Sequence, residues 1–503
     1  MLGVAAFGVL FSGIFLHWYV FIKPTDADVF RAFGAPLSAA ELPPGLAPPR
    51  GGPDGAALRS ATLRHLAGRL VWDLEPASGA SAAIDATTGE QLGQITPVDA
   101  SLIAASVVKA SPEDAKATLL NEYDGSYYEG DPPLPAYRVS FQRPKRVDVY
   151  VDAATGEVMA VVGTRERITL IFGAELHYLK FGPLRLTKYT TLRFIIMGAL
   201  ATAVLVSGVS GLFYGVPLLL RRRWRWMQGR LVQRSTLLRA AHHCLGVVAG
   251  VFVVGWGLSS YMMLWRPSMD PSPAETARVE GGFVDRDAYH IRVPEALATA
   301  TAAGRGPVFM LRAQRLAGRP VYEAYQAPGV STLVDGMSGR VLSPISDSLV
   351  RAIVAHYLGR DPRIKQITYL DHHDAYYRGS PYGRGYSFDG HRLPLPVYRV
   401  DLTSTALPSP LYIDAIRGRL TARVDGNYRV FRWLGSAIHN FDYPSLLERP
   451  RLWDLVVVIP ALLGVLLSGS GLWLGFRHLI RKSQLGRDDT GGTPTTGPGA
   501  QLT

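Results

Sequence analysis

Apolar residues are concentrated in four stretches of the chain, which alternate with longer segments of mixed polarity. Each stretch approaches or exceeds the roughly 20 residues that an α-helix needs to cross the hydrocarbon core of a bilayer. Arg193 and Asp454, near the starts of their stretches, are the only charged residues in them. The pattern predicts four transmembrane helices, at residues 2–22, 192–220, 242–265 and 452–476.

Arginine residues indicate the orientation, because short cytoplasmic loops retain positive charge. The connection 221–241 holds seven arginines and no acidic residue, which predicts a basic cytoplasmic loop. The 477–503 tail begins with basic residues and becomes rich in Gly, Thr and Pro, which predicts a disordered cytoplasmic tail. We therefore expect a bacterial inner-membrane protein with both termini in the cytoplasm and two periplasmic domains, 24–189 and 267–450.

The composition argues against a cleaved signal peptide, against disulfide bonds within the chain and against nucleic-acid binding. The first stretch is too long for the apolar part of a signal peptide, and no small-residue cleavage site follows Ile22, so we expect a retained helix. With Cys244 as the single cysteine, the outer domains must be held by their own cores. The net charge of +12 fits a lipid bilayer partner with a basic juxtamembrane anchor, and no nucleic acid is expected.

Short motifs recur between the two halves of the chain. Tyr-Tyr-Glu-Gly at 127–130 recurs as Tyr-Tyr-Arg-Gly at 376–379, an offset of 249 (376 − 127). Ser-Gly-Leu-Phe-Tyr-Gly at 210–215 recurs as Ser-Gly-Leu-Trp-Leu-Gly at 470–475, an offset of 260 (470 − 210). Both halves enter the membrane from the same side, so the repeats predict a tandem parallel duplication about a pseudo-two-fold axis along the membrane normal.

A smaller unit is repeated within each outer domain. It reads as a strand followed by a tight turn, in which Asp supplies a side-chain acceptor and Gly supplies positive φ. Segments 101–123 and 347–357 have helical spacing between these units, so each outer domain is predicted to be α+β. The four copies of the unit end at 84–90, 151–157, 334–340 and 413–419.

These strand–turn–strand units resemble the PepSY domain, and their position between four apolar stretches resembles the PepSY-associated transmembrane family over nearly the whole chain. That family includes iron-regulated inner-membrane proteins and ferric-siderophore reductases with b-type haem between their helices. The resemblance therefore implies one or two haem b groups. The name PepSY derives from a domain of peptidase propeptides, so the resemblance also implies an inhibitory or chaperone-like alternative.

His177 and His439 occupy duplicated positions, 15 and 13 residues ahead of the spans that follow them (192 − 177; 452 − 439). Imidazoles that face each other across a pseudo-two-fold axis suit the two axial positions of a haem iron. Such ligation leaves no open coordination position and favours electron transfer. The alternative is a matched pair of interfacial histidines that pack under the outer domains.

Three other histidines are candidate cofactor-binding residues. His242 and His243 open the third span, where the resemblance implies the ligand set of a second haem. The duplication places the partner of His243 just before Met1, so we expect either a longer natural chain or a missing ligand. His17 lies inside the first span, where it would contact the outer haem or carry protons, or form a hydrogen bond to a neighbouring helix.

A Tyr- and Arg-rich segment that contains the insertion near 380–392 is a candidate substrate site. Its charge and rings suit an anionic, aromatic or hydroxamate-type iron chelate, although an exposed loop without a ligand has the same composition. The candidates are Tyr376, Tyr377, Arg378, Tyr382, Arg384 and Tyr386.

Two functions follow. In the first, the protein passes electrons outward and reduces a ferric siderophore or another ferric chelate. The sequence has no Rossmann glycine pattern and no P-loop, so the electrons come from an external donor, such as a quinol or a cytosolic flavoreductase. In the second, the protein is a non-catalytic anchor whose PepSY-like domains bind a peptide, a peptidase or another periplasmic partner.

Overall fold

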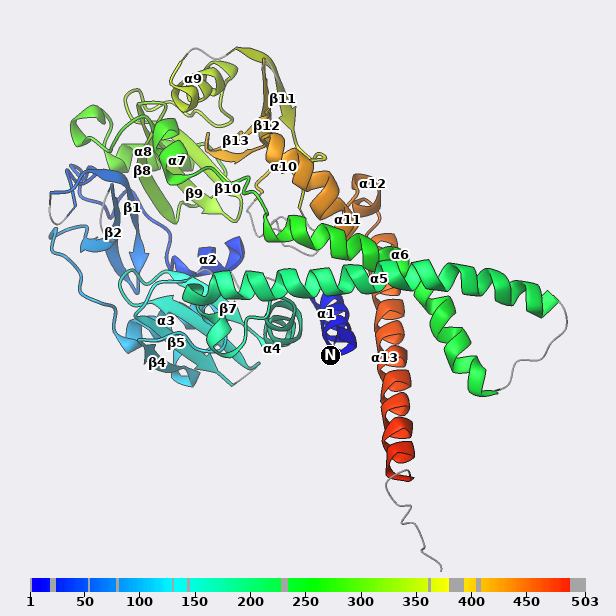
Figure 1. Ribbon diagram of the computed structural model, residues 1–503. Helices are drawn as coiled ribbons and strands as arrows, with labels where there is room; N and C mark the ends of the chain where they lie inside the picture. The colour runs from blue at the N-terminus through cyan, green and yellow to red at the C-terminus, as the bar shows by residue number, and fades with distance from the viewer. Residues whose placement is uncertain are drawn as a thin grey trace, which may run out of the picture.

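The structure combines three antiparallel sheets with a set of long apolar helices (Figure 1). It is a computed structural model, and it describes residues 2–18, 24–52, 55–77, 81–128, 131–142, 145–227, 234–360, 363–379, 393–403 and 409–488. Tyr382, Arg384 and Tyr386 of the predicted substrate segment lie outside these residues.

Both halves of the chain contribute to one six-stranded sheet. Its strand order is β10-β9-β8-β1-β2-β3. The two outer segments are therefore joined by β1–β8 pairing, which the expected division into two separate domains did not anticipate. The strands are β1 (Leu58–Leu66), β2 (Arg69–Pro76), β3 (Ala82–Asp85), β8 (Met310–Leu316), β9 (Arg319–Ala327) and β10 (Val330–Asp335).

The centre of this sheet has the geometry of a two-fold axis. Thr62 of β1 pairs with Arg312 of β8, and the Arg312 Nε donates to the Thr62 Oγ1 at 3.1 Å. These residues are 250 apart, the same offset that separates Asp85 from Asp335 at the ends of β3 and β10. Thr62 and Arg312 thus lie at the axis, and the residues on either side pair symmetrically about it, Ser60 with Gln314 and Arg64 with Met310.

Each half also forms a four-stranded meander, ordered β4-β5-β6-β7 in the first half and β11-β12-β13-β14 in the second. Helices α3 (Pro97–Val108) and α9 (Asp347–Leu358) bury apolar side chains against these sheets. The strands are β4 (Lys116–Leu120), β5 (Ala136–Phe141), β6 (Val147–Asp152), β7 (Val158–Val162), β11 (Ile364–Leu370), β12 (Val397–Leu402), β13 (Leu411–Asp414) and β14 (Leu420–Arg423).

Local sequence explains where these elements end. The predicted turns are present: Asp414, for example, accepts from the backbone N–H groups of Ile416 and Arg417, and Gly418 has a φ of 74°. The helix predicted over 101–123 is shorter, because Lys109 adopts the left-handed conformation and caps α3.

In the Tyr-Tyr motifs, the residues that are structurally equivalent differ by one position from those that the sequence alignment pairs. Asp124 accepts from the backbone N–H of Tyr127, and Asp374 accepts from that of Tyr377. Tyr127 stacks on Tyr150, and Tyr377 stacks on Tyr412. Equivalent residues are therefore 250 apart here, and not 249.

Within the described residues, three helices are long and apolar enough to cross a bilayer. These segments are Thr187–Arg221, Leu238–Leu264 and Pro450–Ile480, which belong to α5 (Thr190–Met227), α6 (Arg234–Leu264) and α13 (Pro450–Asp488). The fourth apolar helix, α1 (Leu2–His17), has 16 residues. Helices α5 and α13 continue beyond the predicted ends of their spans, into the expected loop and tail.

The helices pack in two matched pairs, α1 against α13 and α5 against α6, and α6 also contacts α13. Figure 1 shows α5, α6 and α13 extending away from the sheets. The short helices are α2 (Asp26–Ala32), α4 (Thr164–Thr169), α7 (Pro273–Glu280), α8 (Val293–Ala302), α10 (Gly426–Val430), α11 (Ala437–Asn440) and α12 (Pro444–Leu447), with 3₁₀ turns η1 (Pro112–Asp114), η3 (Gly182–Arg185), η4 (Thr187–Tyr189) and η5 (Arg286–Ala288).

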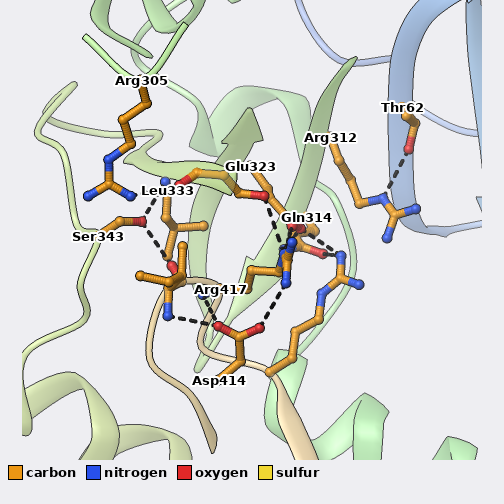
Figure 2. A network of polar contacts seen from close by, with 12 residues as sticks. Thr62, Arg305, Arg312, Gln314, Glu323, Leu333, Ser343, Asp414 and Arg417 are labelled. Carbon is orange, nitrogen blue, oxygen red and sulfur yellow. Dashed lines mark hydrogen bonds and ion pairs between the residues drawn. The ribbon is translucent and has the colours of Figure 1, made fainter. Parts of the chain in front are cut away.

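A buried ionic network fixes the second meander to the six-stranded sheet (Figure 2). Glu323 of β9 is fully buried. It pairs with Arg417 at 3.0 Å and with Arg419 at 2.6 Å, both from the turn that follows β13. In the first half, Arg64 of β1 pairs with Asp73 and donates to the Thr155 carbonyl of the equivalent turn at 2.8 Å. In both halves, arginine contacts thus connect the turn of the meander to the six-stranded sheet.

We expect Glu323→Ala to lower the free energy of unfolding by about 3–5 kcal/mol, because it leaves buried arginines without their carboxylate. Asp287→Ala is the matched control, since its ion pair with Arg50 is largely exposed and such pairs contribute about 0–1 kcal/mol. Guanidinium titration of the detergent-solubilised protein measures both. Equal effects of the two substitutions would contradict the anchoring role.

Candidate functional site

The structure brings His177 and His439 together. Their ring centroids are 6.3 Å apart, and the ring planes are inclined by 74°. The two residues come from opposite halves of the chain and are 262 apart (439 − 177). They therefore lie at matched positions on either side of the interface between the halves.

Each histidine follows a π-helical segment and precedes a residue in the left-handed conformation. The π-helical segments are η2 (Leu170–Glu175) and η6 (Phe431–Ser436). Leu179 has a φ of 53° and Phe441 a φ of 51°. Bulky residues seldom adopt positive φ, and π-helical turns are rare and often occur at functional sites. Neither feature is apparent from the sequence, and both surround the two histidines in the same way.

A serine from an apolar helix fixes the orientation of each ring. Ser12 of α1 lies 3.1 Å from His177 Nδ1, and Ser259 of α6 lies 3.0 Å from His439 Nδ1. Both serines are buried. Neither serine is recognisable from the sequence, where each is only a small polar residue among apolar ones.

The serines also determine which ring nitrogen carries the proton. Ser12 Oγ donates to the Val9 carbonyl, and Ser259 Oγ donates to the Trp256 carbonyl. A hydroxyl has one hydrogen, so each Oγ must accept from the Nδ1–H of its histidine. This tautomer leaves the lone pair of each imidazole on Nε2.

Burial favours the neutral form of both imidazoles. Burial lowers the pKa of His177 to about 4, and burial together with the neighbouring His177 lowers the pKa of His439 to about 3. Both residues nevertheless retain some accessible surface. Each ring therefore keeps a neutral nitrogen, Nε2, of the kind that binds iron.

This donor set fits a haem. An imidazole–metal bond is about 2 Å long, so two nitrogens on one iron lie about 4 Å apart and the ring centroids lie further back, which is compatible with 6.3 Å. No group of three or more His, Cys, Asp or Glu that could hold a metal ion occurs among the described residues. An imidazole pair suits the axial positions of a macrocycle that supplies the other ligands.

Two tryptophans hold the backbone around His439. Trp256 of α6 donates to the His439 carbonyl at 3.0 Å, and Trp453 of α13 donates to the Asn440 carbonyl at 2.9 Å. Helix α11, which follows η6, is thus bonded to two long helices, so His439 is held from both sides.

The other candidate histidines form contacts between helices. His17 of α1 lies 2.8 Å from Asp454 of α13, as expected for a histidine bonded to a neighbouring helix. His242 Nδ1 lies 2.8 Å from Ser470 Oγ, which connects α6 to α13. His243 is adjacent, with its ring centroid 5.9 Å from that of His242.

Two residues of the predicted substrate site, Tyr377 and Arg378, lie inside the protein. Tyr377 is buried, stacks on Tyr412 and donates to the Pro394 carbonyl. Arg378 is also buried, and its Nε donates to Asp442 at 3.0 Å. Because Asp442 follows η6, a contact between distant parts of the sequence turns Arg378 inward. Tyr376 is half-buried beside Trp433.

Comparison with known proteins agrees with this architecture of apolar helices and α+β sheets. A search of curated proteins gives no match. A family model described as the PepSY-associated TM region matches residues 47–478, which is most of the chain and includes both histidines. The chain therefore belongs to the PepSY-associated transmembrane family, and it is a membrane protein.

Proposed function

We propose that this protein is a b-type haem protein of the bacterial inner membrane that carries electrons outward to a ferric siderophore or another ferric chelate. The observation that carries the proposal is the pair of half-buried imidazoles of His177 and His439, with ring centroids 6.3 Å apart. A haem held there supplies a one-electron carrier within the membrane. Each residue of the site then has a defined task.

His177 and His439 would hold the haem iron, and their Nδ1–H groups donate to Ser12 and Ser259. Such hydrogen bonds orient metal-ligating histidines and raise their basicity. A haem held by two protein ligands would have no open position for O₂ or substrate, so the chemistry that it would supply is electron transfer. The chelate accepts an electron at the outer domains, and its oxygen ligands then release Fe²⁺ more readily because Fe²⁺ carries less charge.

The proposed topology has four spans about a pseudo-two-fold axis along the membrane normal. In support, Ser12 of α1 and Ser259 of α6 perform the same task in the two halves. Helix α1 therefore corresponds to α6 although its described part is shorter. The loop after α5 and both termini lie in the cytoplasm, where a flavoreductase donates electrons, or a quinol donates them from the bilayer.

Substituting an axial ligand tests the proposal. We expect the wild-type protein in detergent to show a Soret band and the α-band of a reduced b-type cytochrome. His439→Ala should remove one haem equivalent, because one imidazole cannot provide both axial bonds. His372→Ala is the control, since His372 is exposed in an outer domain. Full haem content in His439→Ala would refute the ligand assignment, and a colourless wild type would support the non-catalytic anchor.

The serines provide a second test. Ser259→Ala removes the acceptor of the His439 Nδ1–H, so the ligand becomes less basic and stabilises ferric iron less. We expect a higher reduction potential and about 10- to 100-fold weaker haem binding. Ser259→Thr keeps the hydroxyl and should restore both values. Spectroelectrochemical and haem-transfer titrations measure them; a potential that is the same in Ala, Thr and wild type would contradict this role.

A further inference from the structure

The segments around η2 and η6 expose large apolar side chains at the same positions in both halves. Eight such residues form four pairs, and the members of each pair are 262 apart. Each exposes between 37 and 55% of its surface. The pairs are Ile168 with Val430, Ile171 with Trp433, Phe172 with Leu434, and Phe181 with Tyr443.

Charged and polar residues of these segments point inward, beside buried apolar residues such as Leu170 and Phe431. In η6, Arg432 and Ser436 are completely buried, and Arg432 Nη1 donates to Asp442 at 3.1 Å. In η2, Glu175 is buried and pairs with Arg185 at 3.0 Å. Soluble proteins bury their apolar residues and expose charged ones. Exposed apolar side chains beside buried charged ones indicate an apolar medium outside these segments.

The exposed surface is continuous with the apolar helices. A side chain at Gly173 of η2 would lie 3.1 Å from the Leu16 backbone nitrogen of α1, and Phe172 contacts Phe15. A side chain at Gly435 of η6 would lie 3.0 Å from Met262 Cβ of α6. Figure 1 shows α10 and α11, which flank η6, running beside α6.

We propose that Ile168–Phe181 and Val430–Tyr443 are embedded in the membrane leaflet nearest the sheets, where their apolar residues contact lipid acyl chains. Amphipathic helices that lie in the membrane interface bury their apolar face in this way. The proposal does not depend on haem. It places the histidine pair below the membrane surface, although the sequence assigns both segments to the outer domains.

Spin labels at single cysteines test the proposal in phosphatidylcholine vesicles. In a Cys244→Ser background, Phe172→Cys and Leu434→Cys carry the label. Val206→Cys on α5 is the lipid control and Val98→Cys on α3 the water control, since both valines are exposed. We expect labels at 172 and 434 to collide with O₂ much more than with a water-soluble nickel chelate, as at 206.

Collision frequencies like those at 98 would overturn the proposal. So would protection from both reagents, since that result means that protein, such as a second copy of the chain, covers the surface. If either variant fails to fold, Ile171→Cys and Trp433→Cys test the same two surfaces.

Discussion

A histidine buried among apolar helices needs a partner for its ring N–H, and here that partner is a serine of the neighbouring helix. The remaining features of the site depend on this constraint. Ser12 and Ser259 fix the tautomers of His177 and His439, and the tautomers determine which nitrogens carry lone pairs. The π-helical segments and left-handed residues then place the two rings together at the interface between the halves.

Local patterns in the sequence predicted much of the fold. Apolar stretches indicated the long helices, and Asp–Gly spacing indicated the turns, because both depend on short-range geometry. Long-range contacts were not predictable. The sequence offset of 243 aligns Ser12 with Gly255 (12 + 243), yet the structure gives its role to Ser259, one helical turn further along. The sequence predicts that Arg378 is exposed, because nothing near it in the chain indicates its buried partner, Asp442, which is 64 residues away.

The two halves keep the histidines in place by different polar contacts. In the second half, Arg378 and Arg432 both bond to Asp442. The first half has Tyr128, Leu170 and Lys180 at the equivalent positions and uses the Glu175–Arg185 pair instead. Buried ionic networks of this kind contribute more to a defined arrangement than to net stability. His177 and His439 therefore share the same backbone geometry but have different charged residues nearby, so their electrostatic environments differ.

Electron paramagnetic resonance of the oxidised, purified protein tests the central claim most directly. Nearly perpendicular imidazole planes, here inclined by 74°, leave two iron d orbitals almost equal in energy. The account therefore predicts a low-spin ferric haem signal with unusually large g anisotropy. A high-spin signal, or the absence of any haem iron, would contradict the assignment of His177 and His439 as a facing pair of axial ligands.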